Sequence, residues 1–334
     1  MSISRFTVKN RIPIYAFLEL TRHCNLSCAH CYIVKENRPE LPADTIKDII
    51  DQLKAHHCLI VNFSGGEVFT RPDFLEIARY ARKQKFGVKI FTNGTLIGER
   101  EADALRELKP IRVEVTIFST RPEVHDSITG VQGSLERSLR ALEWLRAEKV
   151  NLRIKSPLLQ GNAPDYKGVI KLAERLGAQY QLDPGIMPKT DGSRSPAYLR
   201  IGKKDLTEIF RDPQIVSGAG RQKSVHSDLP CSAGHNSCAI SAYGDVFPCV
   251  ALPVKLGSLC EQTFSDLWHN SRDLLRLRSI RSKDLAKCVT CGLKSYCARC
   301  PGVAYLEDGD ILGPSSRSCL CAEAYRDALG EKAG

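Results

Sequence analysis

The chain lacks any long apolar segment. No uninterrupted run approaches the roughly 20 apolar residues that a helix needs to cross a bilayer, and the first ten residues lack the apolar stretch of a secretory signal peptide. Internal repeats and low-complexity segments are also missing. We therefore expect a cytoplasmic globular protein with no membrane partner. Its 334 residues suffice for one large domain and a smaller one.

The sequence also lacks a concentrated basic tract, although its net charge is positive. It contains 48 Lys and Arg against 38 Asp and Glu, which gives a formal charge of +10. The basic residues are scattered along amphipathic stretches, an arrangement typical of solvated helix faces. A nucleic-acid interface would gather them on one face or along one helix. We therefore expect no nucleic-acid partner.

Cysteine, in contrast, is abundant and unevenly placed. Of 14 cysteines, three lie within residues 24–31, Cys58 stands alone, and the others fall between residues 231 and 321. Cytosolic thiols are kept reduced, so cysteines in this number indicate metal or cluster ligands rather than disulfides. The distribution predicts a first domain over residues 1–200, a bridging segment over 201–230 and a cysteine-rich domain over 231–334.

The first 200 residues alternate short β-rich runs with longer amphipathic runs. The expected strands are Ile14–Leu20, Leu59–Phe63, Val88–Thr92, Arg112–Phe118, Asn151–Ser156 and Gln179–Leu182. The expected helices between them are Pro42–Ala55, Pro72–Lys85, Glu99–Leu108, Ser134–Lys149 and Ala163–Leu176, the last ended by Gly177. This alternation predicts an α/β fold of six units around a parallel sheet. In such folds the chemistry lies in the loops after the strands.

The first expected strand is followed by a compact cysteine triplet. Cys24, Cys28 and Cys31 form a C-x3-C-x2-C run. A [4Fe–4S] cluster normally takes four cysteines, and a loop with only three leaves one iron free for an external ligand. The alternative is a zinc knuckle completed by His23 or His30, although zinc requires four ligands in a closed site.

With Tyr32 after it, the triplet resembles the signature of the radical S-adenosylmethionine (SAM) enzymes. In that family, SAM chelates the open iron through its amino and carboxylate groups. One electron from the cluster cleaves SAM, and the resulting 5′-deoxyadenosyl radical abstracts hydrogen from a substrate. The resemblance also implies a partial (β/α)6 TIM-like barrel, which agrees with the six expected units.

Other candidate SAM ligands follow later strands. Gly65 and Gly66 would let the backbone approach a ligand, and with Glu67 they resemble the family's GGE motif, which implies contact with the SAM ammonium group. Asn93 and Ser119 are candidates for the ribose hydroxyls, although turn and capping roles remain open for them.

Two more residues complete the predicted cofactor site. Lys155 lies near the end of the fifth expected strand and is a candidate for the SAM carboxylate. Tyr32 is expected to lie beside the adenine, with a place in the core as the alternative.

The tail carries three cysteine clusters: Cys231-x6-Cys238-x10-Cys249, Cys288-x2-Cys291-x5-Cys297-x2-Cys300 and Cys319-x-Cys321. It resembles the SPASM domain, which implies two auxiliary [4Fe–4S] clusters and therefore three clusters in all. By position, the resemblance implies one cluster on Cys231, Cys238, Cys249 and Cys300. The other would be held by Cys288, Cys291, Cys297 and Cys319. Cys321 competes with Cys319, and a zinc ribbon is the alternative for the paired C-x2-C motifs.

We expect structural roles for several other residues. An amphipathic helix over Phe264–Arg278 is predicted to pack the tail onto the barrel, with Trp268 in the core. Cys58 and Cys260 are expected to be buried or idle thiols. His125 is expected to be solvated or to take part in capping, with a proton carrier as the alternative.

The resemblance extends to SPASM enzymes that modify ribosomally made precursor peptides, and it includes the segment 122–134. Auxiliary clusters suit reactions in which a substrate radical must be oxidised. The implied products are a crosslink, a cut or spliced backbone, or an epimer. Val250 stands where sulfatase-maturing relatives carry an Asp that acts as base, so formylglycine formation is disfavoured.

The expected partners are the precursor peptide, a PqqD-like peptide-recognition protein and a one-electron reductant of the flavodoxin or ferredoxin type. Because only about a dozen residues precede the first strand, the recognition protein is expected to be separate. Two alternatives stay open: a radical SAM decarboxylase of a tetrapyrrole, of the haem-synthesis type, and a non-catalytic zinc or electron-transfer protein.

Overall fold

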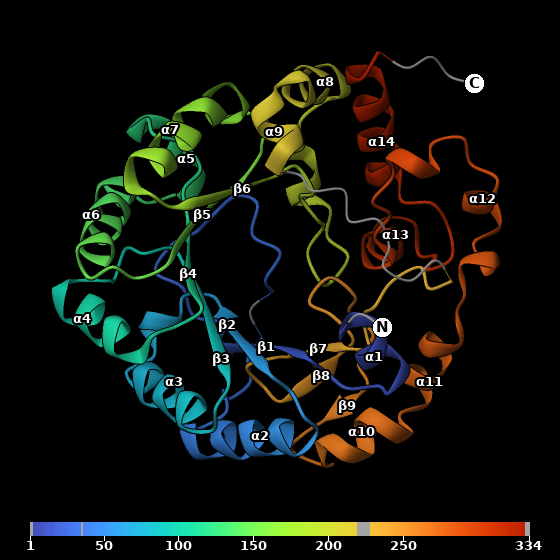
Figure 1. Cartoon of the computed structure of the whole chain (residues 1–334), viewed down its shortest axis with the longest axis horizontal. Coiled ribbons are helices and arrows are strands. Elements are labelled where there is room, and N and C mark those ends of the chain that lie inside the picture. Colours follow the sequence, from blue (N-terminus) through green and yellow to red (C-terminus); the bar gives the residue numbers. More distant parts are fainter. Residues whose placement is uncertain (1–2, 35, 219–227, 331–334) are drawn as a thin grey trace.

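The computed structural model describes residues 3–34, 36–218 and 228–330 (Figure 1). The six predicted strands are present as β1 (Tyr15–Thr21), β2 (Ile60–Gly65), β3 (Gly87–Thr92), β4 (Arg112–Thr116), β5 (Leu152–Pro157) and β6 (Gln179–Asp183). The five predicted helices are present as α2 (Ala43–Ala55), α3 (Phe74–Lys83), α4 (Glu99–Leu108), α6 (Ser134–Ala147) and α7 (Tyr166–Leu176), the last ended by left-handed Gly177. The predicted α/β fold with a partial barrel is therefore confirmed.

The strands β1 to β6 are parallel neighbours in chain order, and their helices lie around the outside (Figure 1). Residues on alternate positions of each strand face these helices. Val88 and Ile90 of β3, for example, belong to the main apolar core, which is the layer between sheet and helices. Lys89 and Phe91 alternate with these two residues along β3, and they therefore face the interior of the partial barrel.

The barrel does not close on itself. Three short strands that the sequence did not predict, β7 (Ser237–Ile240), β8 (Asp245–Phe247) and β9 (Gly257–Ser258), extend the sheet beyond β1. Within the described residues the order is β6-β5-β4-β3-β2-β1-β7-β8-β9, with β7 parallel to β1 and the last two strands antiparallel. The sheet thus continues directly from the barrel into the tail.

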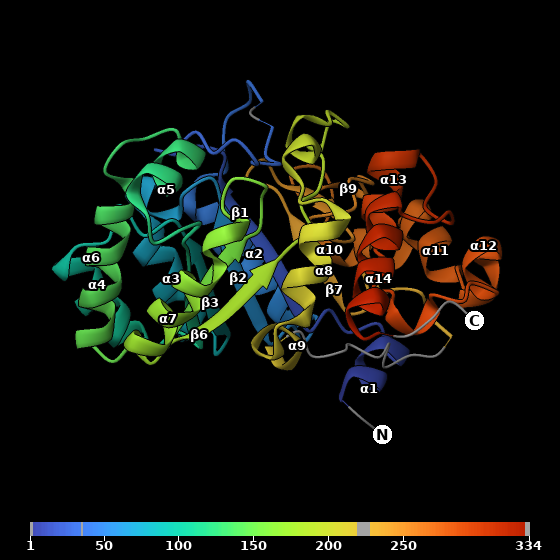
Figure 2. The same ribbon diagram turned by 90° about the horizontal axis from the view of Figure 1, so that it is seen from above.

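A helical layer covers the other edge, beside β6. Helix α8 (Lys203–Arg211) packs on α14 (Ser316–Ala328), and Figure 2 shows these two helices side by side. Leu206 and Ile209 of α8 share a second apolar core with Ala324. Part of the segment predicted as a bridge is therefore ordered against a neighbouring helix. Residues 219–227 of that bridge lie outside the described residues.

The predicted helix over Phe264–Arg278 is broken at Ser271, giving α10 (Phe264–Asn270) and α11 (Arg272–Ser279). Trp268 is 1% exposed, as expected for a core residue, and its Nε1 donates to the carbonyl of Arg11 at 2.6 Å. Helix α10 contacts α2, so it does join the tail to the barrel.

The remaining elements are short. The helices are α1 (Ile3–Lys9), α5 (Pro122–Thr129), α9 (Pro213–Gly218), α12 (Ala286–Val289) and α13 (Pro301–Asp308). The 3-10 turns are Val68–Thr70, Ala163–Asp165, Ser195–Leu199, Ser282–Asp284 and Lys294–Tyr296. Of the helices in the described ranges, none combines the length and the apolar character needed to cross a membrane.

Candidate metal and cofactor site

The cysteine triplet lies in the loop that follows β1, at the carboxyl end of the sheet. Its backbone is held by α5, because the amides of Ser27 and Ala29 donate to the carbonyls of Thr129 and Ile128, both at 2.9 Å. The α5 helix begins with Pro122 at its first turn and ends at a left-handed glycine. Both are helix signals that the sequence offered and that we had not used.

The two glycines after β2 pack against this loop. Gly66 donates its amide to the Thr21 carbonyl at 2.7 Å, and a Cβ atom on Gly66 would lie 2.1 Å from the His23 carbonyl oxygen. A side chain at this position would force the loop away. The two glycines therefore allow the close approach of the cysteine loop, and their predicted contact with a ligand stays a prediction.

Glu67 has a positioning role inside the fold. Its side chain is fully buried and accepts hydrogen bonds from Thr92 Oγ1 at 2.8 Å, the Asn93 amide at 2.7 Å and the Phe69 amide at 3.1 Å. Burial raises the pKa of this carboxyl, while the three donors oppose the rise. Its carboxylate therefore ties β2 to β3 at the turn beside the cysteine loop, and contact with the SAM ammonium group stays a prediction.

The three thiols of the loop lie close enough to affect one another. Burial raises the pKa of Cys28 to about 12, and the neighbouring Cys31 and Cys24 add to the rise. Thiols grouped in this way resist simultaneous ionisation unless positive charge is supplied. Iron supplies that charge, and a coordinating thiol is deprotonated. The donor set therefore suits an iron–sulfur cluster.

The tail brings together a second set of thiols, the first auxiliary group: Cys231, Cys249 and Cys300. Burial raises the pKa of Cys249 to about 11, and both of the other thiols raise it further. Two glycines make this meeting possible. Gly244, at φ +84°, forms the turn between β7 and β8, and Gly302 lets α13 approach the Ala251 carbonyl, where a Cβ atom would lie at 2.1 Å.

The structure does not bring Cys238 to this group. Cys238 lies on β7, opposite Ala16 of β1, and is 0% exposed. The thiol acting on it is that of Cys58, and both belong to the apolar core. Its predicted role as a cluster ligand therefore has no geometric support among the described residues, because the alternation of β7 turns its side chain into the core together with Ile240.

The second auxiliary group contains four thiols: Cys288, Cys291, Cys297 and Cys319. Burial raises the pKa of Cys297 to about 11, followed by the effects of the other three thiols. Cys321 is two residues from Cys319 on α14, and positions two apart on a helix do not face the same side. Cys321 instead packs in the second apolar core beside Arg317. The structure thus favours Cys319 over Cys321.

One backbone motif recurs in all three groups. The amide two residues after the cysteine points at the sulfur: Leu26 to Cys24 at 3.4 Å, Ala233 to Cys231 at 3.4 Å, Ala251 to Cys249 at 3.5 Å and Leu293 to Cys291 at 3.4 Å. A hydrogen bond to the charged form of a group favours that form. These amides therefore stabilise thiolates and would tune the potential of a cluster.

The zinc alternatives gain no support. In the part of the chain that the structure describes, no group of three or more His, Cys, Asp or Glu side chains surrounds a position for one metal ion. A zinc knuckle or ribbon requires such a group. His30, a candidate fourth zinc ligand, packs its ring edge-on against Phe118 with the ring centres 4.9 Å apart.

Two other candidates have internal partners. The Ser119 hydroxyl is fully buried, donates to Asp165 and accepts from the Arg121 amide at 2.9 Å, which favours its capping alternative. Asn93 lies beside the cysteine loop, with its side-chain amide 3.8 Å from the Cys24 sulfur. Of the two, Asn93 is the one placed at the cluster site.

The last two candidates lie on the inner side of the sheet. Tyr32 donates its hydroxyl to Glu19 at 3.3 Å, and Glu19 also pairs with Arg22 at 2.9 Å. Lys155 lies over the ring of Phe91, 4.8 Å from its centre, and is 28% exposed. Neither side chain belongs to the apolar core between the sheet and the helices.

Asp126 is a supporting residue that sequence reasoning missed. Its carboxylate accepts from the amides of Gly133 and Leu135, at 2.6 and 3.0 Å, and from the Ser134 hydroxyl at 2.8 Å. It thereby joins α5 to α6 beneath the cysteine loop. The neighbouring His125 is 1% exposed and its Nδ1 accepts from the Phe118 amide at 3.3 Å, so it has a structural role and is not solvated.

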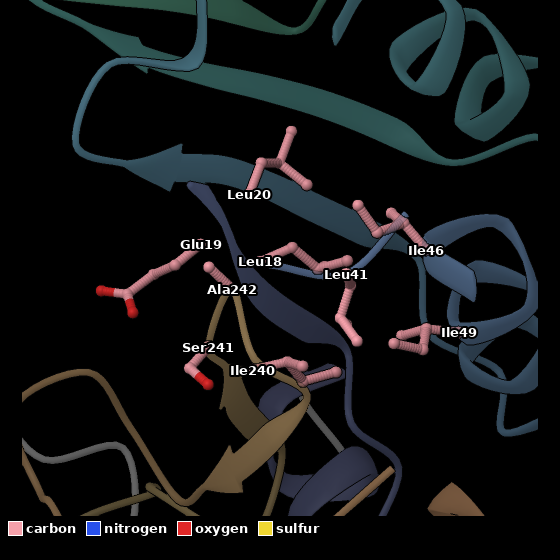
Figure 3. A pocket seen from close by; sticks show the side chains of 9 residues that line it. All are labelled: Leu18, Glu19, Leu20, Leu41, Ile46, Ile49, Ile240, Ser241 and Ala242. Carbon is pink, nitrogen blue, oxygen red and sulfur yellow. The ribbon is translucent and has the colours of Figure 1, made fainter. Parts of the chain in front are cut away.

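Two small hollows lie near the loop. One, of about 10 Å³, is lined mainly by apolar residues of β1, α2 and β7, and Figure 3 shows the Glu19 carboxylate turned away from Leu41 and Ile49. The other, of about 270 Å³, is polar and includes His23, Glu40 and Arg71. Its Arg71 donates to backbone carbonyls and pairs with Asp73, so the cation there is satisfied.

Comparison with known families assigns both parts of the chain. The profile of the radical SAM superfamily matches residues 18–173, and the profile of an iron–sulfur cluster-binding domain, SPASM, matches residues 231–301. The first match begins within β1 and contains the cysteine loop and β2 to β5. The second contains the first auxiliary group and most of the second.

Individual relatives match most of the chain. An AdoMet-dependent heme synthase from Methanosarcina barkeri is 30% identical over 324 residues, covering 88% of this chain and 93% of that protein. The mycofactocin maturase MftC from Mycobacterium tuberculosis is 29% identical, covering 85% and 77%. The crystal structure of Streptococcus suis SuiB bound to precursor peptide SuiA has a TM-score of 0.72 at 19% identity, covering 95% and 79%, which establishes likeness of fold.

Proposed function

The chain belongs to the radical SAM superfamily and carries a SPASM iron–sulfur domain, and from this premise we propose that it modifies a ribosomally made precursor peptide. The observation that carries the proposal is the meeting of three separate thiol groups, one on the barrel and two in the tail. An electron carrier needs no open iron, whereas the three-thiol loop leaves one.

We propose that the cysteine loop holds the cluster that binds SAM, and that the two auxiliary groups hold one [4Fe–4S] cluster each. The clusters and SAM would supply the one-electron chemistry: cleavage of SAM, hydrogen abstraction and removal of an electron from the product. The chain itself fixes the loop through α5, Gly66 and Glu67, and its amides stabilise the thiolates. Asn93, Lys155 and Tyr32 remain our proposed contacts for SAM.

The same reasoning supports the domain limits. We propose a barrel over residues 1–200, a bridge over 201–230 and a SPASM domain over 231–334, since the matched segments fall inside the first and last of these ranges. The tail extends the sheet next to β1, so its first auxiliary group lies on the continuation of the barrel. This continuity would hold the auxiliary clusters at a fixed place relative to a substrate.

Support for a peptide substrate comes from relatives. MftC is a maturase by name, and SuiB was crystallised with a precursor peptide. We further propose that a separate PqqD-like protein presents the peptide and that a flavodoxin or ferredoxin supplies electrons. A single cut or crosslink, a splice and an epimerisation all begin with the same hydrogen abstraction, so the proposal leaves the product class to measurement.

A second candidate is a radical SAM decarboxylase acting on a tetrapyrrole. The observation that favours it is the 30% identity to the heme synthase over 93% of that protein's length. Both candidates require SAM cleavage. They differ in the substrate from which the 5′-deoxyadenosyl radical would abstract hydrogen, a peptide in one case and a tetrapyrrole in the other.

The test is anaerobic co-expression of the chain with any short peptide and PqqD-like protein encoded beside it. We expect a mass change in the peptide and 5′-deoxyadenosine when reductant and SAM are present. An unmodified peptide together with decarboxylation of a tetrapyrrole would replace the first candidate by the second. Absence of 5′-deoxyadenosine with every substrate would overturn both.

A further inference from the structure

Four basic side chains gather inside the partial barrel, and we name them the basic cluster: Lys89, Arg112, Arg153 and Lys155. They come from three neighbouring strands, β3, β4 and β5, whose alternate residues Ile90, Val113 and Ile154 lie in the outer core. The pleat therefore turns the basic cluster to the opposite face, toward the interior. Phe17 of β1 and Phe91 of β3 meet across the same face, with ring centres 5.8 Å apart.

A barrel interior of this kind is normally packed with branched apolar side chains. Here the one acid among the four cations is Glu114, which is 4% exposed. Its oxygens lie 3.5 Å from Arg112 Nε, 3.7 Å from Arg153 Nη1 and 4.0 Å from Lys155 Nζ. Charge-assisted hydrogen bonds are about 2.7–2.9 Å long. Glu114 therefore shares one negative charge loosely among three cations.

The other partners of the basic cluster are neutral. Gln179 accepts from both Arg112 and Arg153, and Gln181 accepts from Arg153 at 3.3 Å. Lys89 lies against the ring of Tyr15, 5.7 Å from its centre, and no ion pair to it occurs among the described residues. The local sum is therefore four positive charges against one negative charge.

Donor groups in the cluster remain unused. The Nε atoms of Arg112 and Arg153 are buried, and neither has a hydrogen-bond partner within the described ranges. A buried donor without a partner is costly, and like charges in proximity repel. Both costs disappear if an anion with several oxygen atoms enters.

The cluster is reachable from solvent, and three of its four members are separate from the cysteine loop. The fourth, Lys155, lies in the carboxyl-terminal half of β5 and is also a proposed SAM contact. Arg153 and Lys155 are 26% and 28% exposed at their side chains. Lys89, Arg112 and Arg153 lie in the amino-terminal halves of their strands, whereas the cysteine loop follows the carboxyl end of β1. Four residues separate Lys89 from Asn93, a span of about 13 Å at the usual rise per residue.

We propose that the basic cluster binds carboxylate groups of the substrate and thereby positions it below the SAM site. The inference rests on the proposed function, because it specifies the chemical class of substrate that would bind inside the same barrel. The spacing of three strands suits a ligand with two or more carboxylates, because the surplus of positive charge is three, or two when Lys155 contacts SAM. Acidic side chains of a peptide and the side chains of a tetrapyrrole both present this chemistry.

The experiment titrates the anaerobically loaded full-length protein with four probes: tri-glutamate, tri-glutamine, a tetracarboxylic porphyrin and its methyl ester. We expect a charged probe to bind at least about tenfold more tightly than its neutral counterpart, because hydrogen bonds to charged groups are stronger than those between neutral groups. The preference should weaken as salt is added. The probe that shows it, peptide or porphyrin, identifies the source of the carboxylates.

Substitutions locate the binding. Arg153→Gln should reduce affinity for the charged probe about tenfold, whereas Arg153→Lys should retain most of it, which separates lost charge from misfolding. Arg140→Gln, on the exposed face of α6, is the matched control and should bind like the wild type. Equal binding of charged and neutral probes, or loss in Arg140→Gln as large as in Arg153→Gln, would overturn the inference.

The proposed function is judged by a different readout. Formation of 5′-deoxyadenosine by the wild-type protein tests the radical chemistry and does not require a probe. A protein that cleaves SAM yet shows no preference for carboxylates would remain a radical SAM enzyme with a different mode of substrate binding. A protein that binds carboxylates but never forms 5′-deoxyadenosine would leave the anion site intact and overturn the function.

Discussion

The barrel and the tail hold their cysteines by different means. The cysteine loop rests on a packed sheet, where α5 binds its backbone and Glu67 fixes the neighbouring turn. In the tail, residues 281–300 carry four cysteines, but Leu285 is the one buried apolar side chain of that segment. A segment without an apolar core cannot offset the entropy lost on ordering.

This difference predicts two roles for the proposed metal clusters. In the barrel, the metal is added to a site that the apolar core has already shaped. In the tail, the ligands themselves supply the stabilisation, since metal binding free energy becomes folding free energy where no site exists beforehand.

The largest contrast is catalytic. Cys28→Ala should reduce formation of 5′-deoxyadenosine by more than about 1000-fold, a change of about 4 kcal/mol, because the open iron loses its site. Cys300→Ala should leave SAM cleavage measurable and stop formation of the modified product. Liquid chromatography of SAM products, with mass spectrometry of the substrate, measures both.

Cys260→Ala serves as the matched control, because this exposed thiol belongs to none of the three groups. It should behave as the wild type in both assays. If Cys28→Ala and Cys300→Ala lost the same activity to the same extent, the barrel and tail clusters would not divide the work.

The second contrast concerns metal removal. Anaerobic chelation of iron should open the segment 281–300 while β1 to β6 keep their protection from hydrogen exchange. Exchange followed by mass spectrometry would show nearly complete loss of protection in peptides that contain Cys291, against little change in peptides from β3. Equal loss in both would mean that the barrel also depends on metal for its fold.

Much of the barrel could be predicted from sequence, because each of its units is local. Strand and helix patterns repeat, and the α4 bounds, Glu99–Leu108, agree with prediction to the residue. The strands β7 to β9 were missed because they are two to four residues long. They join the sheet through the pairing of β7 with β1, which is distant in sequence, and β8 and β9 pair onto β7 in turn. The break at Ser271 was missed because the apolar pattern continues across it.

The predicted site residues fall into the same two classes, those set by local sequence and those set by contacts distant in sequence. Spacing was sufficient to predict the cysteine loop, since its three cysteines are at most seven residues apart. It was insufficient for Cys238, because a strand cysteine directed into the core and a ligand have the same sequence spacing. Glu67 illustrates a further limit: an acid after a strand can bind a ligand or its own fold, and the partners decide which.

A smaller effect sharpens the comparison within the tail. Cys249→Ser should lower the iron content by about one third, from about twelve atoms per chain, because it removes a ligand of the first auxiliary group. Cys238→Ser should leave the iron content unchanged and reduce only stability, since a hydroxyl would enter the core. Iron and sulfide analysis of the reconstituted proteins checks this. If Cys238→Ser lost as much iron as Cys249→Ser, Cys238 would be the fourth ligand of the first auxiliary group.

The smallest expected effect is on stability at low pH, and it concerns His125 of α5. Burial lowers the pKa of His125 to about 4, although Asp126 opposes the shift. The unfolded chain binds a proton near pH 6.5 and the folded chain does not, so the free energy of unfolding falls as pH drops below about 6.5. Between about pH 7 and about pH 5 the loss from this residue is about 2 kcal/mol.

His125→Gln keeps an acceptor for the Phe118 amide and removes the titration. Denaturant unfolding of the loaded protein should therefore show a smaller loss of stability on acidification than in the wild type. Some dependence should persist, because burial also lowers the pKa of His30 to about 4. His57→Asn, at an exposed left-handed position that Asn tolerates, should keep the full slope. If His125→Gln and His57→Asn gave the same slope, acid sensitivity would have to arise outside α5, most directly from the metal-dependent tail.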